Sequence, residues 1–321
     1  MAKKNKRNRG PKPGSNRAER VAARKARQEA ALAGPYRPFE ALPAAECDLV
    51  ALRAFIASAT ARVPFADGYA AAGEADFTTI LPGAVPGIAR SRDAAKWGER
   101  GAATGVDGKV TQALVALQTD PEPADLTGSL AAALEWAAQA APGSEYRGGT
   151  SETGLADIVD PQAPLDVVVY QDFSWWFSDG AEPTPQVQAM LERANETIMP
   201  TARLTPKSGI GAPWWVDAGD RAHLRWVRPE DEDVLMKAMA RLHAAGRLTM
   251  GEGSRFAGSF RTHGLVVPVF DLDNEMHHEE WYAGLDQLDA WFVEALGEDA
   301  ELTAAERSSR AGIIGRQVTL R

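Results

Sequence analysis

The sequence contains a single cysteine, Cys47, among its 321 residues. One thiol excludes an internal disulfide and a zinc site built from several thiolates, and it is typical of proteins from a reducing compartment. Cys47 also lies within an amphipathic helical pattern, where we expect a small core residue rather than a catalytic thiolate. The cysteine content therefore favours a cytoplasmic protein.

Long apolar runs are also absent. The longest, LVALRAFIASATARV, is interrupted by Arg53 and is far shorter than the roughly 20 residues that a membrane-spanning helix needs. The basic start of the sequence is not followed by the apolar region or cleavage site of a secretory signal. We therefore expect no membrane partner and no secretion.

Established catalytic motifs are missing as well. The sequence has no GxSxG nucleophile motif, no HExxH zinc motif, no EF-hand loop and no nucleotide-binding loop. Hydrolase chemistry therefore has no sharp signature here. Whether the protein is an enzyme stays open, and a non-catalytic role is favoured.

Charge is distributed very unevenly along the chain, whose formal net charge is −9. Residues 1–30 contain 11 Lys and Arg against two Glu, a net of +9, and the remaining residues contain 24 against 42 Asp and Glu, a net of −18. Such asymmetry indicates a segment with a partner of its own. The basic residues of this arm are Lys3, Lys4, Lys6, Arg7, Arg9, Lys12, Arg17, Arg20, Arg24, Lys25 and Arg27.

The arm is predicted to bind phosphate groups. Residues 1–16 hold almost nothing apolar and are expected to be disordered, whereas 17–33 are strong helix formers that a partner would order. Dense positive charge attracts nucleic acid by releasing counterions. No lipid-anchoring feature accompanies it, so RNA or the ribosome, with DNA as an alternative, is the expected partner. The other interpretation is a solvated tail that aids solubility.

The body is predicted to be an α+β protein, with helices packed on mainly antiparallel sheets. Leu49, Leu52, Phe55 and Ile56 recur at helical spacing, and later segments alternate between helical and strand patterns. A Gly/Ser/Thr-rich stretch, 142–154, separates two halves. The predicted segments are an arm at 1–33, a first α+β half at 34–150, a second at 155–300 and a C-terminal tail at 301–321.

The two halves resemble each other locally. TQALVALQTD at 111–120 aligns with THGLVVPVFD at 262–271, and a helical pattern with a Leu and a Trp six residues apart follows each. These pairs are Leu130 with Trp136 and Leu285 with Trp291. A duplicated α/β unit and a chance alignment of two ordinary strand-to-helix transitions both explain this.

The densest group of metal-ligating side chains follows an apolar strand pattern in the segment DLDNEMHHEEW. Its candidate ligands are Asp271, Asp273, Glu275, His277 and His278. Such mixed oxygen and nitrogen donors suit a divalent metal that activates water for hydrolysis. The spacing matches no established metal motif, and acidic residues before a helix also serve as N-terminal charges. Both interpretations stay open.

The preceding glycine-rich segment, 251–264, contains Arg255, Arg261 and His263. These side chains and the glycine N–H groups offer a possible anion site, and a hairpin with glycines at its bends explains the segment equally simply. A functional site here would lie one strand from Asp271. That proximity is the argument for a pocket.

Two tryptophan pairs, Trp175–Trp176 and Trp214–Trp215, lie beside predicted strands. Because neighbouring residues on a strand face opposite sides, we expect one ring of each pair in the core and the other facing outward or into a cleft. An outward ring can stack on a base or a ligand, but core packing and sheet coverage are the commoner fate of such rings.

Five segments spread over nearly the whole chain carry a family resemblance. They are PFEALPAAECDLVALR, TILPGA, LDVVVYQDF, AHLRWVRPEDE and GEGSRFAGSFRTHGLVVPVFDLD. Together they resemble an uncharacterised actinobacterial domain-of-unknown-function family with basic N-termini. Some members carry automatic labels such as topoisomerase II or a translocase component, which no motif here supports. The resemblance implies a bacterial cytoplasmic protein and carries over no functional residue.

Two functions follow as hypotheses. The first is a non-catalytic nucleic-acid- or ribosome-associated protein that is anchored by its arm and uses its acidic body to bind a protein partner. The alternative is a metal- or anion-binding, hydrolase-like enzyme with a pocket near Asp271–His278. No cofactor is predicted beyond that possible divalent metal.

Overall fold

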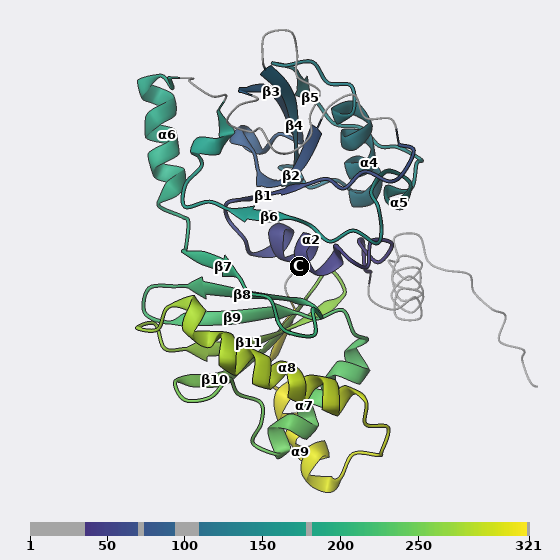
Figure 1. The fold of residues 1–321 in the computed structure, drawn as a ribbon, viewed down its shortest axis with the longest axis vertical. Helices are drawn as coiled ribbons and strands as arrows, with labels where there is room; N and C mark the ends of the chain where they lie inside the picture. Colours follow the sequence, from purple (N-terminus) through teal and green to yellow (C-terminus); the bar gives the residue numbers. More distant parts are fainter. Residues whose placement is uncertain (1–35, 70–73, 94–108, 178–181, 320–321) are drawn as a thin grey trace, which may run out of the picture. The chain divides into compact units, whose positions relative to one another are not determined.

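Two six-stranded sheets and the helices around them make up the fold (Figure 1). The computed structural model describes residues 36–69, 74–93, 109–177 and 182–319, and Pro38–Arg321 forms one compact unit. Helices on mainly antiparallel sheets confirm the predicted α+β class. The predicted basic arm lies outside the described residues. No described helix is both long and apolar enough to span a membrane.

The first sheet has the strand order β5-β3-β4-β2-β1-β6. Its strands are β1 (Ala59–Arg62), β2 (Glu74–Ile80), β3 (Gly87–Asp93), β4 (Lys109–Gln118), β5 (Glu145–Tyr146) and β6 (Val167–Val169). Neighbours are antiparallel except β2 and β4, which run parallel. The helical segments of this half are η1 (Pro82–Ala84), α4 (Leu126–Ala137), α5 (Leu155–Ile158), η2 (Ser174–Trp176) and α6 (Pro185–Asn195).

The second sheet has the order β12-β10-β11-β9-β8-β7. Its strands are β7 (Thr201–Arg203), β8 (Ala212–Asp217), β9 (Ala222–Val227), β10 (Ser254–Thr262), β11 (Leu265–Leu272) and β12 (Gln317–Thr319). Neighbours are antiparallel except β10 and β12. Three α-helices belong to this half: α7 (Glu232–Ala244), α8 (Tyr282–Leu296) and α9 (Ala304–Ile314), with the short η3 (His278–Trp281) before α8 (Figure 1).

Helix α2 (Glu46–Ala54) packs against strands of both sheets, because it contacts β2 and β4 of the first and β8 and β9 of the second. Leu49 and Leu52 are fully buried in a core that also contains Trp214 and Val227 from the second sheet. The amphipathic pattern predicted this helix. Phe55 and Ile56, which contributed to the pattern, lie just beyond its C-terminal end.

Several boundaries differ from the sequence expectation. Strand β6 pairs with β1 and so completes the first sheet, although the sequence placed it in the second half. Residues 301–321, assigned to a tail, contain α9 and β12, which pairs with β10. Helix α4 begins at Leu126, because the Asp125 carboxylate accepts a hydrogen bond from the Gly128 N–H at 3.0 Å and caps it there.

The segments aligned between the halves occupy equivalent places. Strands β4 and β11 are each third in their sheet order, and α4 and α8 are the next α-helices after them. Strand directions do not repeat, however, because β4 runs parallel to β2 whereas β11 runs antiparallel to β9. The connections also differ. Helix α7 lies between β9 and β10 in the second half, whereas only the short η1 lies between the corresponding strands β2 and β3 in the first. The halves therefore share the relative chain order of five neighbouring strands, but the sixth strand comes last in one half and first in the other, and the topologies differ.

Truncating α2 tests its role in joining the sheets. Leu49→Ala should lower the free energy of unfolding by about 3 kcal/mol, as expected for a fully buried leucine that leaves a cavity. Because one core spans both sheets, tryptophan fluorescence and far-UV circular dichroism should report the same shifted transition in urea. Val293→Ala, at an apolar position that is 48% exposed, is the control and should change little. Two separate transitions, with only one of them shifted, would contradict this account.

Candidate functional site

Asp271 lies on β11 between basic side chains of the neighbouring strands. The sheet register places Arg255 of β10 and His223 of β9 opposite it. Its Oδ2 accepts hydrogen bonds from Arg255 Nη2 at 2.6 Å and Arg221 Nη1 at 3.1 Å, and its Oδ1 lies 3.2 Å from His223 Nδ1. Both carboxylate oxygens therefore already face nitrogen atoms of this chain.

These neighbours determine the ionisation of Asp271. Partial burial alone raises the pKa of its carboxyl group, but the hydrogen bond from Arg255 and the charges of His223, Arg255 and Arg221 outweigh burial and hold the pKa below its usual range. The carboxylate is thus anionic and internally neutralised near neutral pH. A metal ion at this position would have to compete with two guanidinium groups.

The other candidate metal ligands make local contacts in the turn after β11. Asp273 Oδ1 accepts from the Glu275 N–H at 3.0 Å, and the His277 N–H donates to the Glu280 carboxylate at 2.7 Å. The rings of His277 and His278 lie 4.0 Å apart. Within the described residues, no three His, Cys, Asp or Glu side chains are placed to hold a metal. The metal hypothesis stays a prediction, supported by the sequence pattern alone.

Some of the predicted residues do come together around an open polar cavity. Asp271, Asp273 and Arg255 line this cavity of about 460 Å³ with Arg221 and other residues of the β8–β9 turn and of β10. The proximity expected between the glycine-rich segment and Asp271 is therefore present. Because arginines and aspartates are mixed on its walls, the cavity has no strong preference for a ligand of either charge.

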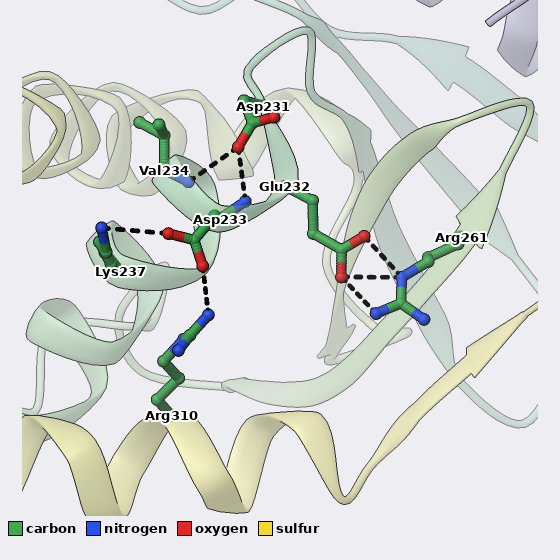
Figure 2. A network of polar contacts seen from close by, with 7 residues as sticks. All are labelled: Asp231, Glu232, Asp233, Val234, Lys237, Arg261 and Arg310. Carbon is green, nitrogen blue, oxygen red and sulfur yellow. Dashed lines mark hydrogen bonds and ion pairs between the residues drawn. The ribbon is translucent and has the colours of Figure 1, made fainter. Parts of the chain in front are cut away.

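The three residues of the predicted anion site do not converge. Arg255 and Arg261 lie six residues apart on β10, which separates them by about 20 Å along an extended strand. Arg255 pairs with Asp271, whereas Arg261 Nε donates to both carboxylate oxygens of Glu232 at 2.8 Å (Figure 2). A bend at Gly258, where a bulge shifts the β10–β11 register, agrees with the hairpin interpretation of the segment.

Glu232 belongs to a polar network at the start of α7 (Figure 2). Asp231 caps the helix by accepting hydrogen bonds from the N–H groups of Asp233 and Val234. The Asp233 carboxylate contacts Lys237 at 3.0 Å and Arg310 of α9 at 2.5 Å. These contacts join α7 to β10 and α9, which gives Arg261 a structural role.

His263 connects the β10–β11 turn to α2. Arg53 Nε donates to His263 Nε2 at 2.9 Å, and Thr262 Oγ1 lies 2.8 Å from His263 Nδ1. Because an arginine N–H can only donate, Nε2 must accept, so the ring proton resides on Nδ1 and the imidazole is neutral. Burial, assisted by the charge of Arg53, lowers the pKa of His263 to about 4, against the raising effect of Glu122.

The tryptophan prediction is wrong in one respect, because all four rings are buried. Trp214 and Trp215 do face opposite sides of β8, but each side is covered by a core: the one around α2 contains Trp214, and the one around α7 and α8 contains Trp215. Trp175 and Trp176 lie in the turn η2 and donate to Ser58 Oγ and the Ile80 carbonyl. None of these rings is placed to stack on a base.

Cys47 behaves as the core residue that the sequence predicted. It is 7% exposed, and burial, together with the charges of Glu46 and Asp48, raises the pKa of its thiol far above the ordinary value. A thiol kept protonated in this way is a poor nucleophile. Nucleophilic chemistry at Cys47 therefore has no structural basis.

The model of a family of unknown function, DUF5926, matches residues 38–321. The chain belongs to DUF5926. Its matched part begins where the compact unit begins, so the basic arm of this DUF5926 protein lies outside the match. Comparisons with curated proteins and with solved structures found no match.

A second cavity was missed by sequence reasoning. It has a volume of about 470 Å³ and lies in the first half, between the loops that follow β2 and β4, the start of α4 and the segment after β5. The only sequence signal for it was the density of Pro and Gly in these loops, which also fits ordinary turns. No motif connects its segments.

The neutral state of His263 predicts how stability depends on pH. The unfolded chain binds a proton near pH 6.5 and the folded protein only near pH 4, so acid favours unfolding between these values. The free energy of unfolding should therefore fall by up to about 2 kcal/mol across this range, after allowing for partial exposure. Urea denaturation at a series of pH values measures it.

The matched variant is His263→Asn, because Asn tolerates the left-handed backbone here, where φ is +48°, and does not titrate. It should flatten this part of the pH profile. His277→Asn, at a side chain that is 60% exposed, is the control and should keep the parent profile. An unchanged profile in His263→Asn would refute the assignment.

Proposed function

We propose that this DUF5926 protein is a non-catalytic, nucleic-acid- or ribosome-associated protein of the cytoplasm, held to its partner by the basic arm. The observation that carries the proposal is the charge split, with +9 in residues 1–30 and −18 in the rest. A segment with this charge density binds phosphates by releasing counterions. In this proposal the arm supplies the attraction to the partner, and the partner in turn positions the body.

The ion pairs of the body support a separate role for the arm. Arginines of both halves are paired with carboxylates of the same chain. Among these pairs are Arg62–Glu74, Arg203–Asp48, Arg228–Glu230, Arg261–Glu232 and Arg310–Asp233. Cations that are occupied in this way contribute little to phosphate binding. The excess of acids in the body would moreover repel a polyanion, so we assign phosphate binding to the arm alone.

RNA is the preferred partner within this proposal, because basic arms commonly become ordered on RNA. The acidic surface of the body then remains free for a protein. Tryptophan stacking plays no part in this mechanism, since the four paired rings are buried.

The test compares the full-length protein with a variant in which all 11 arm Lys and Arg are replaced by Gln. Full-length protein should bind a structured RNA with an affinity that falls on the order of 10²- to 10³-fold when salt rises fourfold, if about six phosphates are contacted. The neutralised arm should lose both the affinity and its salt dependence. Fluorescence anisotropy at two salt concentrations measures this.

Lys207→Gln with Lys237→Gln is the matched control, because both lysines are exposed on the body and paired with Asp. This double variant should bind as the parent does. Equal RNA binding by the neutralised arm and the parent, or binding by neither, would refute the proposal. Co-sedimentation with ribosomes at low and high salt then separates a ribosomal partner from free RNA.

A further inference from the structure

The cavity of the first half lies at the carboxyl ends of two parallel strands. Strands β2 and β4 run parallel, so the carboxyl ends of both strands lie at the same edge of the sheet. The loop after β2, through η1, and the loop after β4 both line the cavity. Ligands commonly bind at such edges, and a volume of about 470 Å³ lies within the usual range for small-molecule sites.

The floor of this cavity is apolar. Leu117 at the end of β4, with Leu126, Leu130 and Ala133 of α4, lines it, and all four side chains are buried in the fold. The ring of Tyr146, which also lines the cavity, packs on Trp136 with a centroid separation of 5.5 Å. An apolar or aromatic ligand body would therefore be removed from water here.

The rim offers a cation and free backbone donors on one side. Arg147 is exposed and has no ion pair with any described residue. Gly148 and Gly149 follow it, and neither N–H donates to a described protein atom. A Cβ at Gly149 would lie 2.9 Å from Tyr146 Oη, so a larger residue there would require that side chain to shift. A guanidinium group beside free N–H groups is suited to an anionic group of a ligand.

The same rim limits how much negative charge it accepts. Asp120 and Glu145 also line the cavity, and both are exposed carboxylates. A ligand with one anionic group can place that group at Arg147 and direct its apolar part to the floor. Among the described lining residues, a polyphosphate would face two carboxylates and one arginine, so nucleotides are disfavoured.

We infer that this cavity is a binding site for a small amphiphile with an apolar or aromatic body and a single anionic group, such as a carboxylate or sulfonate. The inference is independent of nucleic-acid binding by the arm. Arg147 and the following glycine N–H groups hold the anionic group, and the leucines of β4 and α4 hold the body.

Two fluorescent probes that differ mainly in charge test this assignment on the full-length protein. Anilinonaphthalene sulfonate carries the aromatic body and one anion, and N-phenylnaphthylamine carries the body alone. Both should bind to the native protein. Arg147→Gln should weaken the sulfonate about three- to tenfold and leave the neutral probe unchanged, since it removes one exposed charge-assisted contact. Arg193→Gln, an exposed arginine on α6, is the charge-matched control.

A second variant tests the location of the apolar body. Ser129→Phe places a ring where α4 lines the cavity and should reduce the binding of both probes at least tenfold. Ala132→Phe, on the same helix but outside the lining, should reduce neither. Circular dichroism checks that both variants fold.

Three outcomes would overturn the inference. They are no binding of either probe to the parent, equal weakening by Arg147→Gln and Arg193→Gln, and full binding to folded Ser129→Phe.

Discussion

The burial of α2 is the constraint on which the rest of the structure depends. Every residue from Glu46 to Leu52 is buried, because strands of both sheets pack against this one helix. A helix buried all round contributes apolar side chains to two directions at once, so the two sheets share one continuous core. Neither sheet could lose α2 without exposing a large apolar face.

Burying α2 imposes conditions on its charged residues. A charge removed from water is tolerated only when it is paired and hydrogen-bonded. The Asp48 carboxylate accepts a hydrogen bond from Arg203 Nε of β7 at 2.7 Å. The Arg53 guanidinium group donates to Glu122 and to His263. The partners come from both halves of the chain, so the electrostatic contacts reinforce the apolar ones. The neutral state of His263 follows from this, since burial disfavours a charged ring and a second cation beside Arg53 would also be repelled.

Local pattern was sufficient to predict the elements but not what covers them. The spacing around Leu49 indicated α2, and strand alternation placed Trp214 and Trp215 on opposite faces, both correctly. That both faces are covered depends on helices far away in the sequence, which no local pattern encodes. For the same reason β6 looked like the start of a second half, although its pairing with β1 joins segments about 100 residues apart.

The candidate sites show the same limit. Sequence reasoning found Asp271 because ligating side chains were dense there, and the strand register then placed Arg255 and His223 opposite it, which composition could not reveal. The cavity near Arg147 was missed because its lining comes from four separate segments, none of which carries a motif. Both cases depend on which strands become neighbours.

The acid excess of the body links the two proposed binding functions. Ion pairing neutralises charges locally without changing their sum, so the net charge of −18 outside the arm remains. A body with this field repels polyanions, and attraction to phosphate must then come from a segment with its own dense positive charge. The same field favours an anionic ligand only beside a local cation such as Arg147, which has no ion pair with a described residue, and only if the ligand carries little charge. The proposed polyanion binding by the arm and the proposed restriction of the cavity to single anions therefore follow from one charge distribution.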